Sequence, residues 1–196
     1  MGERKRLLRG PRCGYHRRHM RKIMLMTTGG TIEKTYDERT GELSNRQSIV
    51  RRMLRRLRLE DTEVTILELM SKDSLDLTPG DRHRIAGAVE EHAAPDSRSD
   101  VSAVVILHGT DTLQQTGELL LERIPRPRVP IVLTGALRPF EMKRSDALQN
   151  LNEALFATGL LEPGVYCVAH GRALRFPGVY KDRERGTFLR SENGKE

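Results

Sequence analysis

Hydroxyl and carboxylate side chains follow three short apolar runs of this 196-residue sequence. Thr31 closes the stretch "TTGGT", Ser71 ends the run "VTILELMS", and Thr110 and Asp111 follow the run "VVILHG". A hydroxyl beside a carboxylate, with glycines that leave backbone N–H groups free, provides a nucleophile, an activating group and oxyanion donors. Each motif alone is more often a tight turn or a helix cap. Together they predict a covalent acyl-transfer site, provided that the fold brings them into one place.

The apolar runs are typical of buried strands in a parallel sheet. Their continuous Val, Ile and Leu content suits strands that are covered on both faces. In an open parallel sheet, ligands bind beyond the carboxyl ends of the strands, which is where the hydroxyl and carboxylate residues lie. We expect five such strands, at residues 22–28, 64–71, 101–109, 130–136 and 164–171.

Amphipathic segments alternate with these runs. The first would be capped by Ser44 or Asn45, with its arginines facing solvent, and the second by Thr78 with Pro79 in the first turn. The alternation of strands and helices predicts an α/β fold with helices on both faces of a mainly parallel sheet. We expect four helices, within residues 44–57, 78–94, 110–124 and 144–158.

The net charge of +7 arises at the amino terminus. Nine of the 34 Lys and Arg residues, but one of the 27 acidic residues, lie within residues 1–22, so the rest of the chain is nearly neutral. This basic segment has a single aromatic residue, Tyr15, whereas surfaces for single-stranded nucleic acid combine charge with stacking side chains. We therefore expect residues 1–21 to be a disordered tail, and we expect neither a nucleic-acid nor a membrane partner.

The spacing of cysteine and histidine indicates no metal site. Cys13 and Cys167 are too few for a disulfide framework, which fits a reducing cytoplasm. His16 and His19 form an HxxH pair, but short motifs recur by chance, and a solvated pair is the better interpretation in so basic a segment.

Four segments resemble the bacterial-type L-asparaginase family. The resemblance extends over residues 22–188 and rests on "TTGGTIEK", "LHGTDTLQQTGELL", "PIVLTGALRPFEMKRSDALQNLNEAL" and "GRALRFPGVYKDRERGTF". It implies a flavodoxin-like, three-layer α/β/α sandwich, for which we set the folded domain at residues 22–190 and a disordered end at residues 191–196. It also implies an amidohydrolase that converts L-asparagine to L-aspartate and ammonia without a cofactor.

The resemblance also implies catalytic roles by position. Thr31 would be the nucleophile, on a mobile loop after the first strand, and the hydroxyl of Tyr36 would assist it. Thr110, Asp111 and Lys181 would form a second catalytic set, in which Lys181 promotes deprotonation of Thr110 or of water. Asp111 would in addition bind the α-amino group of the substrate.

The same resemblance implies how the substrate is held. Ser71 would hold the α-carboxylate, and the glycine turns at Gly30 and Gly109 would line the pocket and supply oxyanion donors. Lys72 stands where the family often has glutamine, and a lysine cannot accept a hydrogen bond from an ammonium group. Larger relatives have a C-terminal domain that supplies an acidic residue to a neighbouring site. This chain resembles the short, single-domain members, and we expect Asp73 to act as a substitute acid.

Other functions stay open at this point. Another amidase, or an ammonia-supplying component of an amidotransferase, would use the same nucleophile, and L-glutamine could be a weak substrate. A non-catalytic amino-acid-binding module would keep Ser71 and Asp111 but have no turnover. A nucleic-acid-binding protein that depends on the basic tail is the least favoured alternative. We expect a homodimer or homotetramer, because closed symmetric assemblies are the commonest oligomers and would cover the sheet ends.

Overall fold

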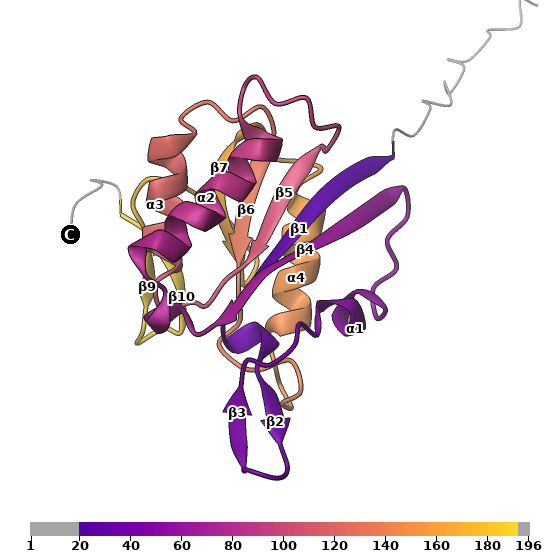
Figure 1. The fold of residues 1–196 in the computed structure, drawn as a ribbon, viewed down its shortest axis with the longest axis vertical. Helices are drawn as coiled ribbons and strands as arrows, with labels where there is room; N and C mark the ends of the chain where they lie inside the picture. Colours follow the sequence, from indigo (N-terminus) through magenta and orange to yellow (C-terminus); the bar gives the residue numbers. More distant parts are fainter. Residues whose placement is uncertain (1–19, 192–196) are drawn as a thin grey trace, which may run out of the picture.

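A six-stranded sheet forms the centre of the computed structural model, which describes residues 20–191 (Figure 1). Neighbouring strands are parallel except for β7 and β8, which are antiparallel. All five predicted strands are present, and their flavodoxin-like order confirms the predicted α/β fold. Across the sheet the strands are β4 (Thr62–Lys72), β1 (Arg21–Gly29), β5 (Ala103–Leu107), β6 (Pro130–Thr134), β7 (Gly164–Ala169) and β8 (Arg172–Arg175).

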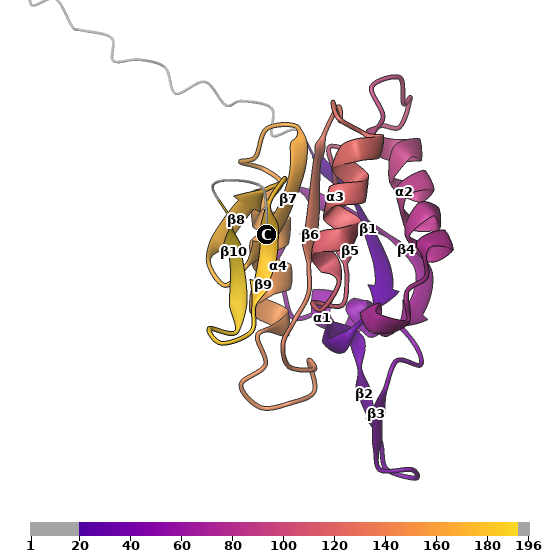
Figure 2. The same ribbon diagram turned by 90° about the vertical axis from the view of Figure 1, so that its left-hand side faces the viewer.

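Successive side chains of the central strands enter two separate hydrophobic cores. In β1, Leu25 packs into the core on one face of the sheet and Met26 into the core on the other, and both are fully buried. The predicted three-layer arrangement is therefore confirmed (Figure 2). The Met26 face is covered by α2 (Pro79–Ala93) and α3 (Leu113–Arg123), and the Leu25 face by α1 (Val50–Leu54) and α4 (Ala147–Ala157).

One predicted strand differs from the expectation of burial on both faces. β4 lies at an edge of the sheet, and its residues alternate between exposed and partly buried positions. Glu63, Thr65 and Glu68 are among the exposed ones. The difference arises because an edge strand pairs on one side only.

Two hairpins and β8 were not predicted from the sequence. The segment expected to be a mobile loop instead forms a short antiparallel hairpin, which projects beyond the carboxyl end of the sheet (Figures 1 and 2). Strands of three or four residues with polar side chains show no clear alternation of polar and apolar residues, and the sequence pattern therefore missed them. The hairpins are β2 (Thr35–Asp37) with β3 (Glu42–Ser44), and β9 (Val179–Asp182) with β10 (Thr187–Arg190).

The helix caps were predicted correctly for α2 and wrongly for α1. The hydroxyl of Thr78 accepts a hydrogen bond from the N–H of Asp81 at 3.1 Å, and the Asp81 carboxylate accepts one from the N–H of Thr78 at 2.9 Å. The first helix spans only Val50–Leu54 rather than residues 44–57. Ser44 does not cap it, because Ser44 pairs with Thr35 at the end of β3.

The folded domain begins one residue before the predicted boundary. Arg21 is the first residue of β1, and its guanidinium group donates to Thr62 Oγ1 at 2.9 Å and to the Leu155 carbonyl at 3.3 Å. The rest of the predicted tail, with Cys13, His16 and His19, and the end of the chain after residue 191, lie outside the described residues. None of the helices within residues 20–191 has the length and hydropathy needed to cross a bilayer.

Candidate active site

Close backbone contacts join the carboxyl ends of β1, β4 and β5. The N–H of Gly30 donates to the Lys72 carbonyl at 2.8 Å. Gly30 has a φ of 78°, and a Cβ atom on it would lie 2.4 Å from the Cα of Gly109, so no other residue fits there without a shift of the backbone. Because Thr31 follows Gly30 and Thr110 follows Gly109, this contact brings the two predicted catalytic segments together.

The segment after β4 packs against the same place. A Cβ atom on Gly109 would lie 2.5 Å from the Cβ and Oγ of Ser74, a buried residue of the 3-10 helix η2 (Ser74–Asp76). The hydroxyl of Thr112 donates to the Ser74 carbonyl at 2.8 Å. Three strand ends are thus locked together by small side chains, and the hydroxyl groups selected from the sequence lie around this junction.

Lys181 joins the second predicted catalytic set. Its Nζ atom donates to Thr110 Oγ1 at 2.8 Å and lies 3.1 Å from Asp111 Oδ1. The Lys181 side chain is 13% exposed, and Thr110 is buried. Arg183 provides a second ion pair to Asp111 at 2.9 Å. Lys181 is therefore placed to exchange a proton with the Thr110 hydroxyl, and the Asp111 carboxylate orients its ammonium group.

Thr31 and Tyr36 lie apart from each other. Thr31 begins the short 3-10 helix η1 (Thr31–Glu33) and is partly exposed. Tyr36 lies on β2, is 57% exposed, and has its hydroxyl beside Gly41 in the turn of the hairpin. No hydrogen bond connects Tyr36 to Thr31 within the described part of the chain. The β2–β3 hairpin would have to move for the tyrosine to reach the threonine.

Of the residues expected to bind the substrate after β4, Ser71 is exposed at the rim of a cavity of about 410 Å³, which Lys72 and Asp73 also line. The Nζ atom of Lys72 donates to both carboxylate oxygens of Asp81 at 2.8 Å, and this bond holds the pKa of Asp81 well below its usual range. Asp73 pairs with Lys34 at 2.7 Å, which lowers the pKa of Asp73. The charges of Lys72 and Asp73 are thus already compensated by protein groups.

A buried glutamate beside the glycine turn could not be recognised from the sequence. Glu33 is 1% exposed, accepts a hydrogen bond from the N–H of Gly29 at 3.2 Å, and accepts another from the hydroxyl of Ser48. Burial raises the pKa of Glu33 to about 7. In the sequence it resembles one more charged residue of a loop, and only its position within η1, behind the turn, reveals its role.

A buried histidine braces the other turn. The Nδ1 atom of His108 lies 2.8 Å from the Gly109 carbonyl, and its Nε2 atom lies 2.8 Å from Thr116 Oγ1. Burial lowers the pKa of His108 to about 4, so the ring is neutral near pH 7. Because a carbonyl oxygen only accepts, Nδ1 carries the proton and Nε2 accepts from Thr116. Residues 20–191 contain no cluster of three or more His, Cys, Asp and Glu side chains that could hold a metal ion.

Known proteins share both this sequence pattern and this fold. Residues 22–188 match the family model described as Asparaginase, N-terminal. The chain is 30% identical over 145 residues to the L-asparaginase of Thermococcus kodakarensis, which covers 74% of this chain and 43% of that protein. It is 35% identical over 156 residues to one subunit of the Glutamyl-tRNA(Gln) amidotransferase of Thermoplasma acidophilum, which covers 74% of this chain and 35% of that protein.

A solved structure gives the same result. The thermostable L-asparaginase from Thermococcus kodakarensis superposes with a TM-score of 0.76 at 30% sequence identity. The superposition covers 86% of this chain and 51% of that chain. The sequence therefore spans about half the length of this solved relative and less than half of the two curated relatives.

Proposed function

The chain belongs to the asparaginase family, and on this premise we propose that it is an L-asparaginase that hydrolyses the side-chain amide of L-asparagine to L-aspartate and ammonia. The observation that supports this most is the buried contact of Lys181 with Thr110 and Asp111, beside the Gly30–Gly109 junction. A hydroxyl in contact with an amine, next to free backbone N–H groups, suits acyl transfer.

The reaction would proceed in two halves through a threonine ester. The Oγ atom of Thr31 attacks the amide carbon of the substrate, the C–N bond breaks, and the proton of the hydroxyl leaves with the nitrogen as ammonia. Water then adds to the β-aspartyl ester and transfers a proton toward Thr110 and Lys181. Cleavage of the ester bond releases aspartate and returns a proton to Thr31. Backbone N–H groups near Gly30 and Gly109 would stabilise the oxyanion in both halves.

Substrate binding would divide between the two sides of the site. The exposed hydroxyl of Ser71 would hold the α-carboxylate, and Asp111 would hold the α-amino group. Asp73 could add a second carboxylate, but only by giving up part of its ion pair with Lys34. A longer substrate such as L-glutamine would misplace its amide relative to Thr31, so we expect it to be the weaker substrate. We propose no cofactor and a reducing, cytoplasmic location, which suits the free and buried Cys167.

A second candidate function comes from the similarity to an amidotransferase component. The Thermoplasma acidophilum protein is more identical to this chain than the Thermococcus kodakarensis L-asparaginase is. A component of this kind would release ammonia for use by a partner protein rather than hydrolyse free asparagine rapidly. A binding module without turnover is the third candidate. It would keep the substrate contacts but not depend on Thr31.

One assay separates these candidates. Ammonia release from L-asparagine and from L-glutamine is measured for the chain alone and for Thr31→Ala. Thr65→Ala, an exposed threonine in the middle of β4, is the matched control. We expect release from asparagine that Thr31→Ala abolishes and Thr65→Ala leaves unchanged. Binding of asparagine without release would support the amidotransferase component or the binding module. Release that survives Thr31→Ala would contradict the proposed nucleophile.

A further inference from the structure

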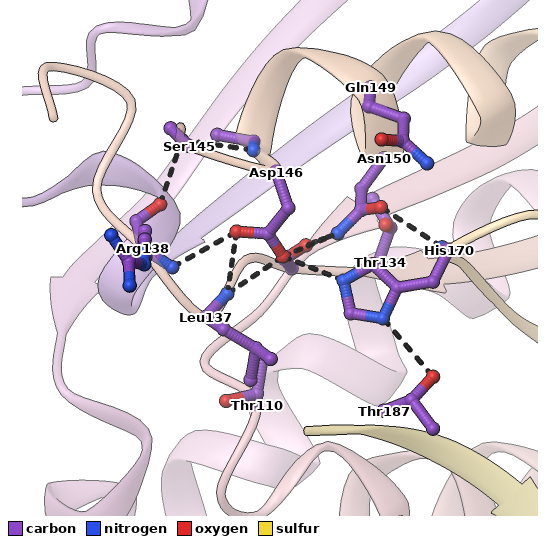
Figure 3. A network of polar contacts seen from close by, with 12 residues as sticks. Thr110, Thr134, Leu137, Arg138, Ser145, Asp146, Gln149, Asn150, His170 and Thr187 are labelled. Carbon is purple, nitrogen blue, oxygen red and sulfur yellow. Dashed lines mark hydrogen bonds and ion pairs between the residues drawn. The ribbon is translucent and has the colours of Figure 1, made fainter. Parts of the chain in front are cut away.

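His170 lies between two polar groups that come from opposite sides of the candidate site. Its Nε2 atom is 2.8 Å from Asp146 Oδ2, and its Nδ1 atom is 3.1 Å from Thr187 Oγ1. Figure 3 shows the imidazole ring between the two side chains. Asp146 precedes α4, whereas Thr187 is the first residue of β10. His170 itself follows β7 directly and is partly buried.

The partners fix the direction of both hydrogen bonds. Burial raises the pKa of Asp146, but hydrogen bonds from the N–H of Leu137, from His170 and from the N–H of Arg138 outweigh it and place that pKa below its usual range. Asp146 is therefore a carboxylate, which only accepts hydrogen bonds. It follows that Nε2 of His170 carries the proton, and that the Nδ1 lone pair accepts a hydrogen bond from the Thr187 hydroxyl.

The Asp146 arm of this network ends at one wall of the Thr110 site. Asp146 accepts hydrogen bonds from the N–H groups of Leu137 and Arg138 at 3.0 Å each and from Asn150 Nδ2 at 2.9 Å. Asn150 in turn donates to the Gly135 carbonyl at 2.9 Å. A Cβ atom on Gly135 would lie 3.1 Å from the Cγ2 atom of Thr110. The turn that Asp146 holds therefore packs against the Thr110 side chain.

The Thr187 arm ends at the opposite wall. Thr187 pairs with Asp182 across the β9–β10 hairpin, and Lys181 is the next residue along β9. Lys181 then contacts the Thr110 hydroxyl through its Nζ atom. His170 thus stands where the support of the Thr110 methyl group meets the support of the lysine that contacts the Thr110 hydroxyl.

The backbone at His170 is also in an unusual conformation. Its φ is 53°, in the left-handed region that is uncommon for residues other than glycine. The N–H of His170 donates to Asn150 Oδ1 at 3.1 Å, which ties this conformation to the same network. Such a conformation persists only where the surroundings hold it, and here the surroundings are the groups that position Thr110.

We infer that His170 is a positioning residue that couples the Gly135–Arg138 turn to the β9–β10 hairpin and so sets the distance between Lys181 and Thr110. The inference rests on the proposed function for its kinetic consequence, but not for its structural one. If either arm is lost, Lys181 is less well aligned with Thr110, and the water-dependent half of the reaction slows. The contacts of Ser71 with substrate do not depend on this network, so asparagine binding changes little.

The kinetic test uses variants that each keep one arm. His170→Gln places an amide nitrogen near the position of Nε2 and keeps the bond to Asp146. His170→Asn tolerates the left-handed backbone and keeps an acceptor for Thr187. Thr187→Val removes the hydroxyl at nearly constant shape, and Thr187→Ser restores it. The matched control is Thr65→Val, in the exposed middle of β4.

We expect Thr187→Val, His170→Gln and His170→Asn each to lower kcat by about threefold to tenfold, the effect of one lost hydrogen bond, with KM nearly unchanged. Thr187→Ser should recover most of the rate, and Thr65→Val should show no loss. A merely structural role would not give this recovery together with a loss confined to kcat. A loss that appears only in KM, or equal rates in all variants, would overturn the inference.

A second measurement does not need turnover. Nitrogen-15 NMR of the free chain should show His170 with its proton on Nε2, and Thr187→Val should shift the Lys181 ammonium resonance, whereas Thr65→Val should not. A proton on Nδ1, or a Lys181 resonance that ignores Thr187→Val, would overturn the positioning role. If the NMR result is as expected but no ammonia is released from asparagine, the proposed function fails and the positioning role stands.

Discussion

Lys181 is the residue on which the chemistry of the candidate site depends most. It is largely buried, and its amine contacts both the Thr110 hydroxyl and the Asp111 carboxylate. Burying a lysine is costly unless the amine is paired, and here the pairing is with one carboxylate and one hydroxyl. The arrangement suits a group that moves a proton rather than one that only supports the fold.

Lys181→Met should therefore lower kcat by about 10²-fold to 10⁴-fold, the range expected for the loss of a general acid–base group. Folding should be little affected, because methionine keeps an apolar stem and Arg183 still pairs with Asp111. Steady-state ammonia release and urea unfolding measure the two effects. Lys22→Met, at the opposite end of β1, is the control. Normal turnover by Lys181→Met would remove this residue from the mechanism.

Glu33 makes the stability of the fold depend on pH. Its pKa is about 7 in the folded chain against 4.5 for an ordinary glutamate, so the folded state binds this proton more tightly than the unfolded state. The free energy of unfolding should then fall as the pH rises from about 4.5 to about 7, by up to about 3 kcal/mol. Ser48 and Gly29 remain its hydrogen-bond partners in either protonation state.

Glu33→Gln should remove this pH dependence, because a glutamine resembles the protonated glutamate and can keep both hydrogen bonds. We expect the variant to be more stable than the wild-type chain at pH 8 and equally stable at pH 4. Urea unfolding at the two pH values tests this, with exposed Glu63→Gln as the control. A variant that is less stable at pH 8 would show that the charged carboxylate, rather than the neutral one, is the stabilising form.

At the level of elements, the β2–β3 hairpin is the part whose position the proposed chemistry requires to change. It projects beyond the carboxyl end of the sheet, and it carries Tyr36 with its side chain mostly in solvent (Figure 1). The hairpin is joined to the body by few contacts, among them the N–H of Tyr36, which donates to Glu141 Oε2 at 3.1 Å. Elements held this loosely are the ones that commonly close over a substrate.

Tyr36→Phe should lower kcat about 10²-fold or more without changing stability, because the hydroxyl acts only when the hairpin closes. Addition of asparagine to Thr31→Ala should slow amide hydrogen exchange in residues 35–44. Tyr180→Phe, an exposed tyrosine on β9, is the control. Equal turnover by Tyr36→Phe, or exchange that does not respond to asparagine, would contradict this role.

The sequence could predict the elements that obey a simple pattern. β1 and β5 to β7 are continuous apolar runs, and Thr78 with Pro79 marks the start of α2. The hairpins are too short and too polar to show a period, and α1 is limited because Ser44 belongs to β3. In such cases the tertiary contacts of a segment, rather than its own pattern, decide its structure.

The same limit applies to the candidate site. Strand ends predicted that Thr31, Ser71 and Thr110 share one edge of the sheet, which the close contact of the glycine turns supports. Lys181 lies 71 residues beyond Thr110, and no periodicity links them, so only the family resemblance selected it. Glu33 and His170 were missed, because their roles follow from burial and from partners far along the chain.

At the scale of the whole molecule, two cores hold a rigid sheet whose carboxyl end remains open. The buried residues of β5 and β6 are covered by helices on both faces, whereas the candidate site is bounded by loops, η1 and two hairpins. A partner surface could cover such a site more fully than one chain does. We propose a homodimer or homotetramer for this reason.

Light scattering over a range of concentrations tests the assembly. We expect a mass of two or four chains at the concentrations at which asparagine is hydrolysed, and a specific activity that falls when the assembly dissociates on dilution. A monomer with full specific activity would show that one chain completes the site alone.

The most direct test of the proposed mechanism is to trap the acyl-enzyme. Thr110→Val keeps the shape of the side chain but removes the hydroxyl that contacts Lys181. If Thr110 serves the second half of the reaction, this variant should react with asparagine, release one equivalent of ammonia and stall. Intact-mass and peptide analysis should then locate a β-aspartyl adduct on Thr31. An adduct on Thr110 in a Thr31→Ala chain would contradict the assignment of the two threonines.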